Sequence, residues 1–136
     1  MLAILIAGVL GLLAAVHAYW AIGGARGRDA AVPQRANGAR LFTPRTSSTW
    51  AVAAALAVAA TLVLAAGGWW QISLPSPALR ILCGLLALAF LLRGIGDFRW
   101  VGLFKRERHG RFARLDSWAY SPLCIGLAVA LALVVY

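Results

Sequence analysis

Four apolar stretches of about twenty residues each dominate this sequence and restrict what the chain can fold into. They span residues 2–22, 50–70, 78–96 and 118–136. A helix rises about 1.5 Å per residue, so each stretch could cross the roughly 30 Å hydrocarbon core of a bilayer. Because 62% of the 136 residues are hydrophobic and only 12% are charged, a soluble domain of this length could not bury them. We therefore predict an all-α membrane protein, a single domain over residues 1–136 forming a bundle of four transmembrane helices.

Basic residues gather in two of the three connections between these stretches. Five arginines lie in residues 23–48 and six lysines and arginines in residues 97–117, whereas residues 71–77 carry no charge. Positively charged loops stay in the cytoplasm, so we expect the first and third connections inside and both termini outside. The first stretch resembles a signal peptide in residues 16–18, but no positive charge precedes it, and we interpret it as a retained helix.

The formal net charge of +9 would suggest nucleic-acid binding in a soluble protein. In a membrane protein, the excess of basic residues in the cytoplasmic loops already explains this charge. The sequence also contains no recognised nucleic-acid-binding motif, so we expect no nucleic-acid partner. The basic turn of the third connection is expected to set the orientation and to contact anionic lipid headgroups, through Lys105, Arg106, Arg108 and Arg111.

Polar side chains from three different helices fall at about the same depth, near the predicted cytoplasmic face. These candidate site residues are His17, Tyr19, Trp20, Arg93, Asp97, Arg99, Asp116, Tyr120 and Ser121. Charges of both signs are costly at a membrane unless they are paired. One interpretation is therefore a structural ion-pair cluster of Arg93, Asp97 and Asp116, and the other is a binding or catalytic site. Arg93 and Asp97 would share a helical face if the third helix extended that far.

His17 lies about one turn from the inner end of the first helix. It could form a structural hydrogen bond, contact a ligand or act as an acid–base group. A metal ranks last because the possible co-ligands form no spacing pattern, and we predict neither a metal site nor a cofactor. Cys83 and Cys124 fall at different predicted depths and are expected to be reduced thiols.

The second stretch is rich in alanine. Small residues allow helices to approach closely in lipid, where packing drives association. We expect this helix either to be central to the bundle or to lie in a contact with a second copy or another membrane protein. Residues 47–49 (Ser-Ser-Thr) could cap its first turn.

Four motifs, in order, resemble those of a family of small bacterial membrane proteins. They are H-x-Y-W-x-x-G-G at 17–24, R-x-x-G-D-F-R-x-V-G-x-F-K at 93–105, F-A-x-x-D at 112–116 and Y-S-P-L-C at 120–124. The family is the domain of unknown function numbered thirty-nine ninety-five. The resemblance implies a four-helix protein without an assigned activity, and we expect a multi-pass protein of the bacterial cytoplasmic membrane.

Three functions are compatible with this sequence. The first is a small scaffold or subunit, or a bundle that binds lipid or a small molecule, with its polar cluster at the cytoplasmic interface. The alternative is a membrane-embedded enzyme acting on a lipidic substrate, with His17, Asp97, Asp116 and Tyr120 as acid–base groups and Arg93 holding an anion. A transporter ranks third, because no carboxylate lies in the middle of any predicted helix.

Overall fold

The computed structural model describes residues 1–135, and this part of the chain is all-helical. Four helical segments are long and apolar enough to cross a membrane, which confirms the predicted fold class. Tyr136, the last residue of the fourth predicted stretch, lies outside the described residues. The segments are α1 (Leu2–Ala21), α2 (Thr46–Ala66), α3 (Ser76–Ile95) and a continuous run divided into α4 (Gly110–Leu115), η2 (Asp116–Tyr120) and α5 (Ser121–Val135).

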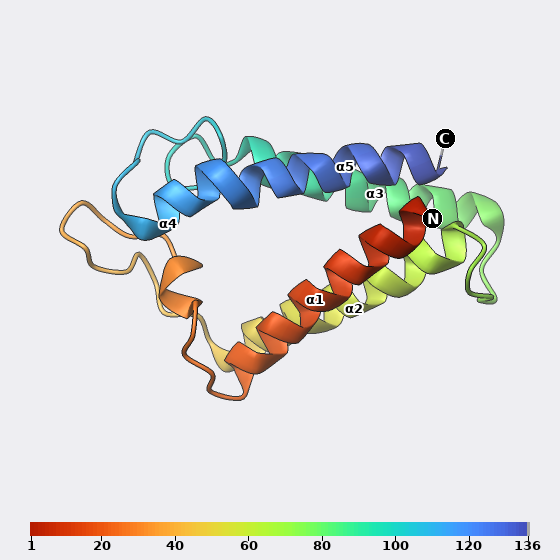
Figure 1. Ribbon diagram of the computed structural model, residues 1–136, viewed down its shortest axis with the longest axis horizontal. Coiled ribbons are helices and arrows are strands. Elements are labelled where there is room, and N and C mark those ends of the chain that lie inside the picture. Colours follow the sequence, from red (N-terminus) through yellow and green to blue (C-terminus); the bar gives the residue numbers. More distant parts are fainter. Residues whose placement is uncertain (136) are drawn as a thin grey trace.

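The helices pair into two antiparallel hairpins, α1 with α2 and α3 with α5 (Figure 1). The hairpins meet at the end where both termini lie and diverge toward the end where residues 22–45 and 96–109 connect the helices. A short 3₁₀ helix, η1 (Arg28–Ala30), lies in the first of these connections.

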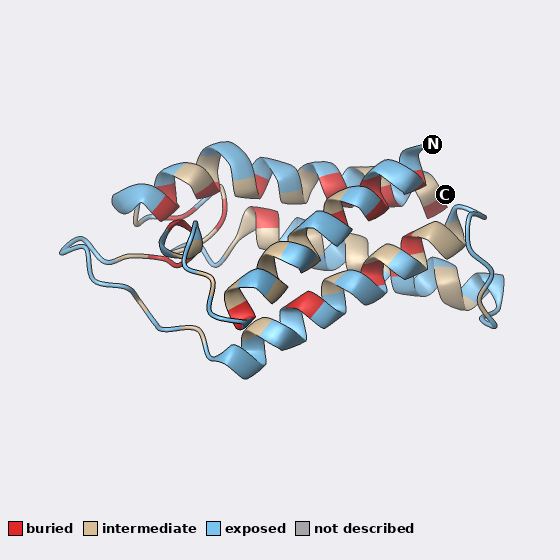
Figure 2. Cartoon of the chain, turned by 60° about the horizontal axis from the view of Figure 1, so that its bottom comes forward, coloured by how far each residue is buried: buried red, intermediate tan, exposed pale blue. Residues whose placement is uncertain are grey.

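The apolar core sits where the hairpins meet. Its buried members come from α1, α2 and α5, and they are Ala3, Ile6, Leu10, Ala59, Val63, Leu127 and Leu131. Most of the remaining helical surface is exposed and apolar (Figure 2). Leu12 and Leu133, for example, are 66% and 70% exposed. A water-soluble bundle would bury such residues, so this surface suits contact with lipid chains.

Helix α2 begins and ends four residues earlier than the predicted range 50–70. It ends at Ala66 because Gly67 and Gly68 follow, with Gly68 at a φ of 75° that favours glycine. The expected serine or threonine cap is wrong, since the N-cap is Arg45 and makes no side-chain cap bond. The hydroxyl groups of Ser48 and Thr49 instead donate to the Arg45 carbonyl.

A central position for α2 is also wrong. Its buried residues are Ala53, Ala59 and Val63, and many of its other alanines are exposed. The helix packs mainly against α1 and occupies an edge of the bundle (Figure 1). Its contact with a second chain stays a prediction.

The fourth segment begins at Gly110, before the predicted start at residue 118. Within it, the Ser121 amide donates to the Asp116 carbonyl, five residues back, which forms the π-helical turn η2. Pro122 comes next and cannot donate a backbone hydrogen bond, so a helical irregularity is expected here. Such single-turn π segments often occur at functional sites.

The first long connection, residues 22–45, contains buried residues and a backbone bridge. Ala30 and Val32 are buried, and the backbones of Gln34 and Arg40 form an isolated antiparallel bridge. Asp29 and the guanidinium of Arg40 form an ion pair. The connection therefore supplies fixed backbone close to the space between the hairpins.

Candidate ligand-binding site

Asp116 is the centre of a buried ion-pair cluster, and its side chain is completely shielded from solvent. Its Oδ1 accepts a hydrogen bond from Arg93 Nη2 at 2.8 Å. Its Oδ2 accepts from the Gly102 amide at 2.7 Å and from Lys105 Nζ at 3.1 Å. Both carboxylate oxygens of Asp116 are thus engaged by donors within the protein.

Lys105 completes this cluster, which corrects its prediction as a lipid contact. The ammonium is completely buried and also donates to the Gly102 carbonyl and to Ser117 Oγ, at 3.0 and 2.7 Å. All three ammonium hydrogens therefore have acceptors within the protein. A lysine held in this way cannot reach lipid headgroups, because extracting it would leave Asp116 with an unpaired buried charge.

Asp97 lies outside the ion-pair cluster. Helix α3 ends at Ile95, so Asp97 does not share a helical face with Arg93. Its Oδ1 accepts hydrogen bonds from the backbone amides of Arg99, Trp100 and Val101 at 2.9, 2.7 and 2.9 Å. Partial burial tends to raise the pKa of this carboxyl, but these donors outweigh it and hold the pKa below its usual value. Asp97 thus orders the turn that follows α3.

Two glycines allow that turn to fold. Gly96 and Gly102 have φ values of 92° and 94°, and their backbones touch, so that a Cβ on either would overlap main-chain atoms. The Leu103 amide donates to the Gly94 carbonyl at 3.0 Å, which closes the loop against the end of α3. This close approach positions the Gly102 amide to face Asp116.

A cavity of about 550 Å³ opens between the hairpins next to this cluster. One wall comes from α1 and the first connection, and the other from α3, α4, η2 and α5. Its lining residues are Leu13, Val16, His17, Trp20, Gly27, Ala30, Ala31, Arg93, Arg111, Phe112, Leu115, Tyr120, Leu123 and Cys124. Apolar lining with a few polar groups is typical of a small-molecule site.

His17 and Tyr120 are both tied to the backbone beside this cavity. The Nδ1 of His17 donates a hydrogen bond to the Leu13 carbonyl at 2.8 Å. The Tyr120 hydroxyl donates to the Ala30 carbonyl at 3.1 Å and so joins the fourth helical segment to the first connection. The next residue, Ser121, is buried, and its Oγ has no hydrogen-bond partner within residues 1–135.

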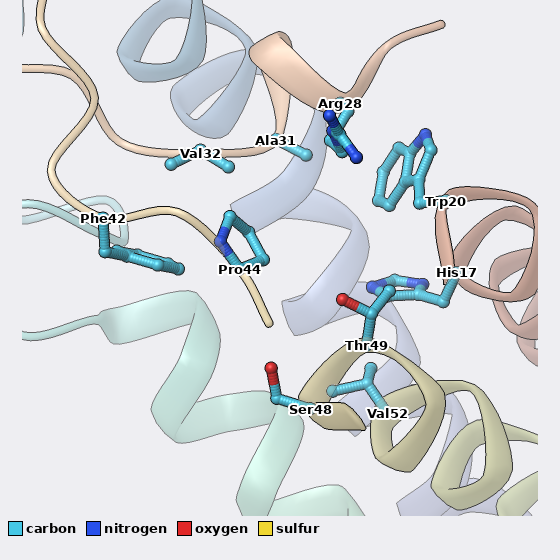
Figure 3. Close-up of a pocket in the computed structure, with 10 residues that line it drawn as sticks. All are labelled: His17, Trp20, Arg28, Ala31, Val32, Phe42, Pro44, Ser48, Thr49 and Val52. Carbon is cyan, nitrogen blue, oxygen red and sulfur yellow. The ribbon is translucent and has the colours of Figure 1, made fainter. Parts of the chain in front are cut away.

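A second cavity, of about 330 Å³, lies on the α2 side of α1 (Figure 3). His17, Trp20 and Ala31 line both cavities. Helix α2 contributes Ser48, Thr49 and Val52, while Phe42 and Pro44 come from the first connection. The shared residues therefore place the two cavities next to each other.

A sequence model described as a protein of unknown function, DUF3995, matches residues 10–131. The chain belongs to the DUF3995 family. No curated protein and no solved structure matches the chain.

In this DUF3995 protein, several predicted site residues surround one cavity although they come from distant helices. His17, Trp20, Arg93 and Tyr120 all line it. Asp116 and Ser121 are buried. These residues come from α1, α3 and the fourth helical segment, at the end of the molecule where the two hairpins diverge (Figure 1).

Other predicted residues of the DUF3995 chain lie elsewhere. The ring of Tyr19 packs closely over Gly24, and the Arg99 guanidinium lies 5.3 Å from the centre of the Trp100 ring. Arg106 and Arg108 are exposed on the third connection, whereas Arg111 lines the cavity. Only some of the predicted site residues therefore line the same cavity.

Sequence reasoning missed the structural role of Lys105 in this DUF3995 protein. A signal was present, because the motif at 93–105 ends on Lys105 and leaves out the arginines that follow. Phe112 and Leu115 were also missed as cavity residues. In the sequence, an apolar residue that lines a cavity looks the same as one that packs in the core or faces lipid. Within residues 1–135, no three His, Cys, Asp or Glu side chains converge to hold a metal ion.

Proposed function

We propose that this protein binds a small amphiphile or lipid in the cavity between its two hairpins. The observation that carries this proposal is the lining of the 550 Å³ cavity, where His17, Arg93 and Tyr120 lie among apolar side chains. Such a lining accommodates both a polar head and an apolar tail. The ion-pair cluster around Asp116 acts as the scaffold that holds one wall in place.

The environment of the carboxylates favours binding over catalysis. An acid–base enzyme needs a group that is free to exchange a proton with its substrate. Asp116 accepts hydrogen bonds at both oxygens, and Asp97 accepts three from the backbone. The acid–base alternative would then depend on His17 and Tyr120 alone, so we place it second.

We also propose that the protein spans the bacterial cytoplasmic membrane with both termini outside. The support is the basic excess of connections 22–45 and 96–109, which lie at the same end of the molecule (Figure 1). In this orientation the cavity opens near the cytoplasmic leaflet. The exposed alanines of α2 leave a surface on which a second copy or another membrane protein could pack.

The binding proposal can be tested by photo-crosslinking in phosphatidylcholine nanodiscs. The probe is an acyl amphiphile with a diazirine in its chain, and the labelled residues are mapped by mass spectrometry. We expect labelling around residues 13–20 and 120–124, lost when Val16→Trp fills the cavity.

The control is Leu12→Trp on the same helix, because Leu12 is exposed and should face lipid. This variant should keep the cavity labelling, while ordinary lipid contacts label the outer surface in every case. Labelling confined to the outer surface, or unaffected by Val16→Trp, would overturn the proposal.

A further inference from the structure

The charges around the large cavity do not balance. Arg93 and Arg111 are among its lining residues, and none of those residues is an aspartate or glutamate. The nearby Asp116 is shared between Arg93 and Lys105. In the cluster, two cations (Arg93 and Lys105) share one anion (Asp116). Arg111 adds a third positive charge at the cavity. The site therefore has an excess of positive charge in a largely apolar setting, where electrostatic attraction is strong.

Arg93 also has unused hydrogen-bonding capacity. Its Nη2 donates to Asp116, while its Nη1 is buried and has no hydrogen-bond partner in the described chain. The side chain as a whole is 37% exposed. This nitrogen is enclosed by protein atoms, so a ligand would bind through the exposed part of the side chain. Arg93 lines the cavity, and a guanidinium is well suited to bind a second planar or tetrahedral anion.

Part of the apolar lining lies farther from the ends of its helix than these cations lie from the ends of theirs. Arg93 and Arg111 are close to helix ends, at Ile95 and Gly110. Leu13 lies about 12 Å from the end of α1 at Ala21, at 1.5 Å per residue. Val16 and Leu123 also line the cavity. Cations near helix ends, with apolar side chains farther along the helices, match an amphiphile that has a charged head and an apolar tail.

We propose that the cavity selects amphiphiles with an anionic head, a phosphate or carboxylate, and seats that head on Arg93 and Arg111. The inference rests on the proposed binding function and adds the chemical class of the ligand. The same head chemistry could come from an acidic lipid or from a free phosphate compound. The apolar lining favours the lipid, and the experiment separates the two sources.

The test measures binding of four probes to the full chain in phosphatidylcholine nanodiscs, by competition against the photo-crosslinking amphiphile. Lysophosphatidic acid carries head and tail, monooleoylglycerol carries only the tail, and glycerol 3-phosphate and inorganic phosphate carry only the head. We expect lysophosphatidic acid to bind about ten-fold or more tightly than monooleoylglycerol, as one charge-assisted hydrogen bond would provide. The two soluble anions should compete weakly.

Arg111→Gln is the main variant, because Arg111 is exposed and makes no ion pair within residues 1–135. It should weaken binding of lysophosphatidic acid about ten-fold and leave monooleoylglycerol unchanged. Arg114→Gln is the matched control on the same helix, since Arg114 is exposed and does not line the cavity. Arg93→Lys keeps a cation for Asp116 but loses the second guanidinium nitrogen. It should also reduce the preference for lysophosphatidic acid over monooleoylglycerol.

The outcomes separate this inference from the proposed function. Equal binding of lysophosphatidic acid and monooleoylglycerol, with no effect of Arg111→Gln, would overturn the anionic-head inference while the cavity still binds amphiphiles. Soluble phosphates that compete as well as lysophosphatidic acid would support the anion site and overturn its assignment to a lipid. Cavity labelling that none of the four probes displaces would overturn the anionic-head inference, whereas labelling confined to the outer surface would overturn the proposed function as well.

Discussion

The ammonium of Lys105 lies 3.1 Å from the carboxylate of Asp116, and neither side chain is exposed. Their attraction is offset by the cost of removing both charges from water, so the pair need not add net stability. Its effect is positional, because it fixes the 96–109 connection against the fourth helical segment. Arg93 joins the same carboxylate from α3, so three parts of the chain meet at one buried anion.

Replacing Lys105 with methionine should therefore destabilise the protein strongly. The substitution leaves Asp116 buried with a single cation, and losses of about 3–5 kcal/mol are typical when one partner of a buried pair is removed. Chemical unfolding of the detergent-solubilised protein, followed by circular dichroism, measures this loss. Arg106→Met is the control because Arg106 is exposed. Equal stability of the two variants would contradict the role of the buried pair.

At Gly94, α3 approaches α5 closely. A Cβ there would lie 2.6 Å from Ile125 Cγ1 and 3.3 Å from the Ser121 carbonyl oxygen. Gly94→Ala should cost about 1–3 kcal/mol through overpacking. Gly126→Ala, where a Cβ meets nothing within 4 Å, should be neutral or slightly stabilising. The same unfolding measurement distinguishes these effects, and a neutral Gly94→Ala would show that the helices can separate freely.

Asp97 should make the stability of the protein depend on pH. Its pKa is lowered in the folded protein by backbone donors, despite the opposing effect of burial. The ionised carboxyl therefore stabilises the fold above the unfolded pKa of about 3.9. This stabilisation is lost as the pH falls through the folded pKa.

Thermal unfolding of the wild type and Asp97→Asn between about pH 6 and pH 2.5 tests this linkage. The wild type should be more stable at the upper end, and the difference should shrink as the carboxyl becomes protonated. Comparison with the asparagine variant cancels the titration of other groups that the two proteins share. A difference that stays constant over this range would exclude the proposed contribution of the Asp97 charge.

The Tyr120 hydroxyl should hold the first connection against the fourth helical segment. Tyr120→Phe removes its hydrogen bond to the Ala30 carbonyl, at a cost of about 1 kcal/mol. Hydrogen exchange of peptides covering residues 28–33 should then accelerate about five-fold if local opening controls it. Tyr19→Phe is the control, since no hydrogen bond from its hydroxyl is present in residues 1–135. Unchanged exchange in Tyr120→Phe would contradict this connection.

The proposed orientation predicts the outcome of reporter fusions. A reporter active only in the cytoplasm should be inactive at the C-terminus and active when inserted after His109, in the basic third connection. His109 is exposed, so an insertion there should be tolerated. The opposite pattern would invert the orientation.

Hydrophobicity along the chain was sufficient to predict the membrane fold. Each apolar stretch is long enough to span a bilayer, and a helix satisfies its own backbone hydrogen bonds there. Position along a helix also determines depth, which is why His17, Arg93 and Tyr120 could be grouped from the sequence. Their common cavity follows from that shared depth and from the pairing of the helices.

The partners of the charged residues depended on tertiary structure. The turn at Gly96 and Gly102 directs Lys105 and a backbone amide toward Asp116, while Asp97 turns to the backbone of its own loop. Sequence spacing could not reveal these partners, because α3 ends at Ile95. Beyond it, residues with positive φ redirect the chain, so helical spacing no longer predicts which side chains are neighbours. The sequence by itself determined that four helices are long and apolar enough to cross a membrane and that most charges lie near or beyond the helix ends. Only the folded loops and the divergence of the hairpins decided which charges pair and which face the cavity, because pairing requires contact in three dimensions between segments far apart in the chain.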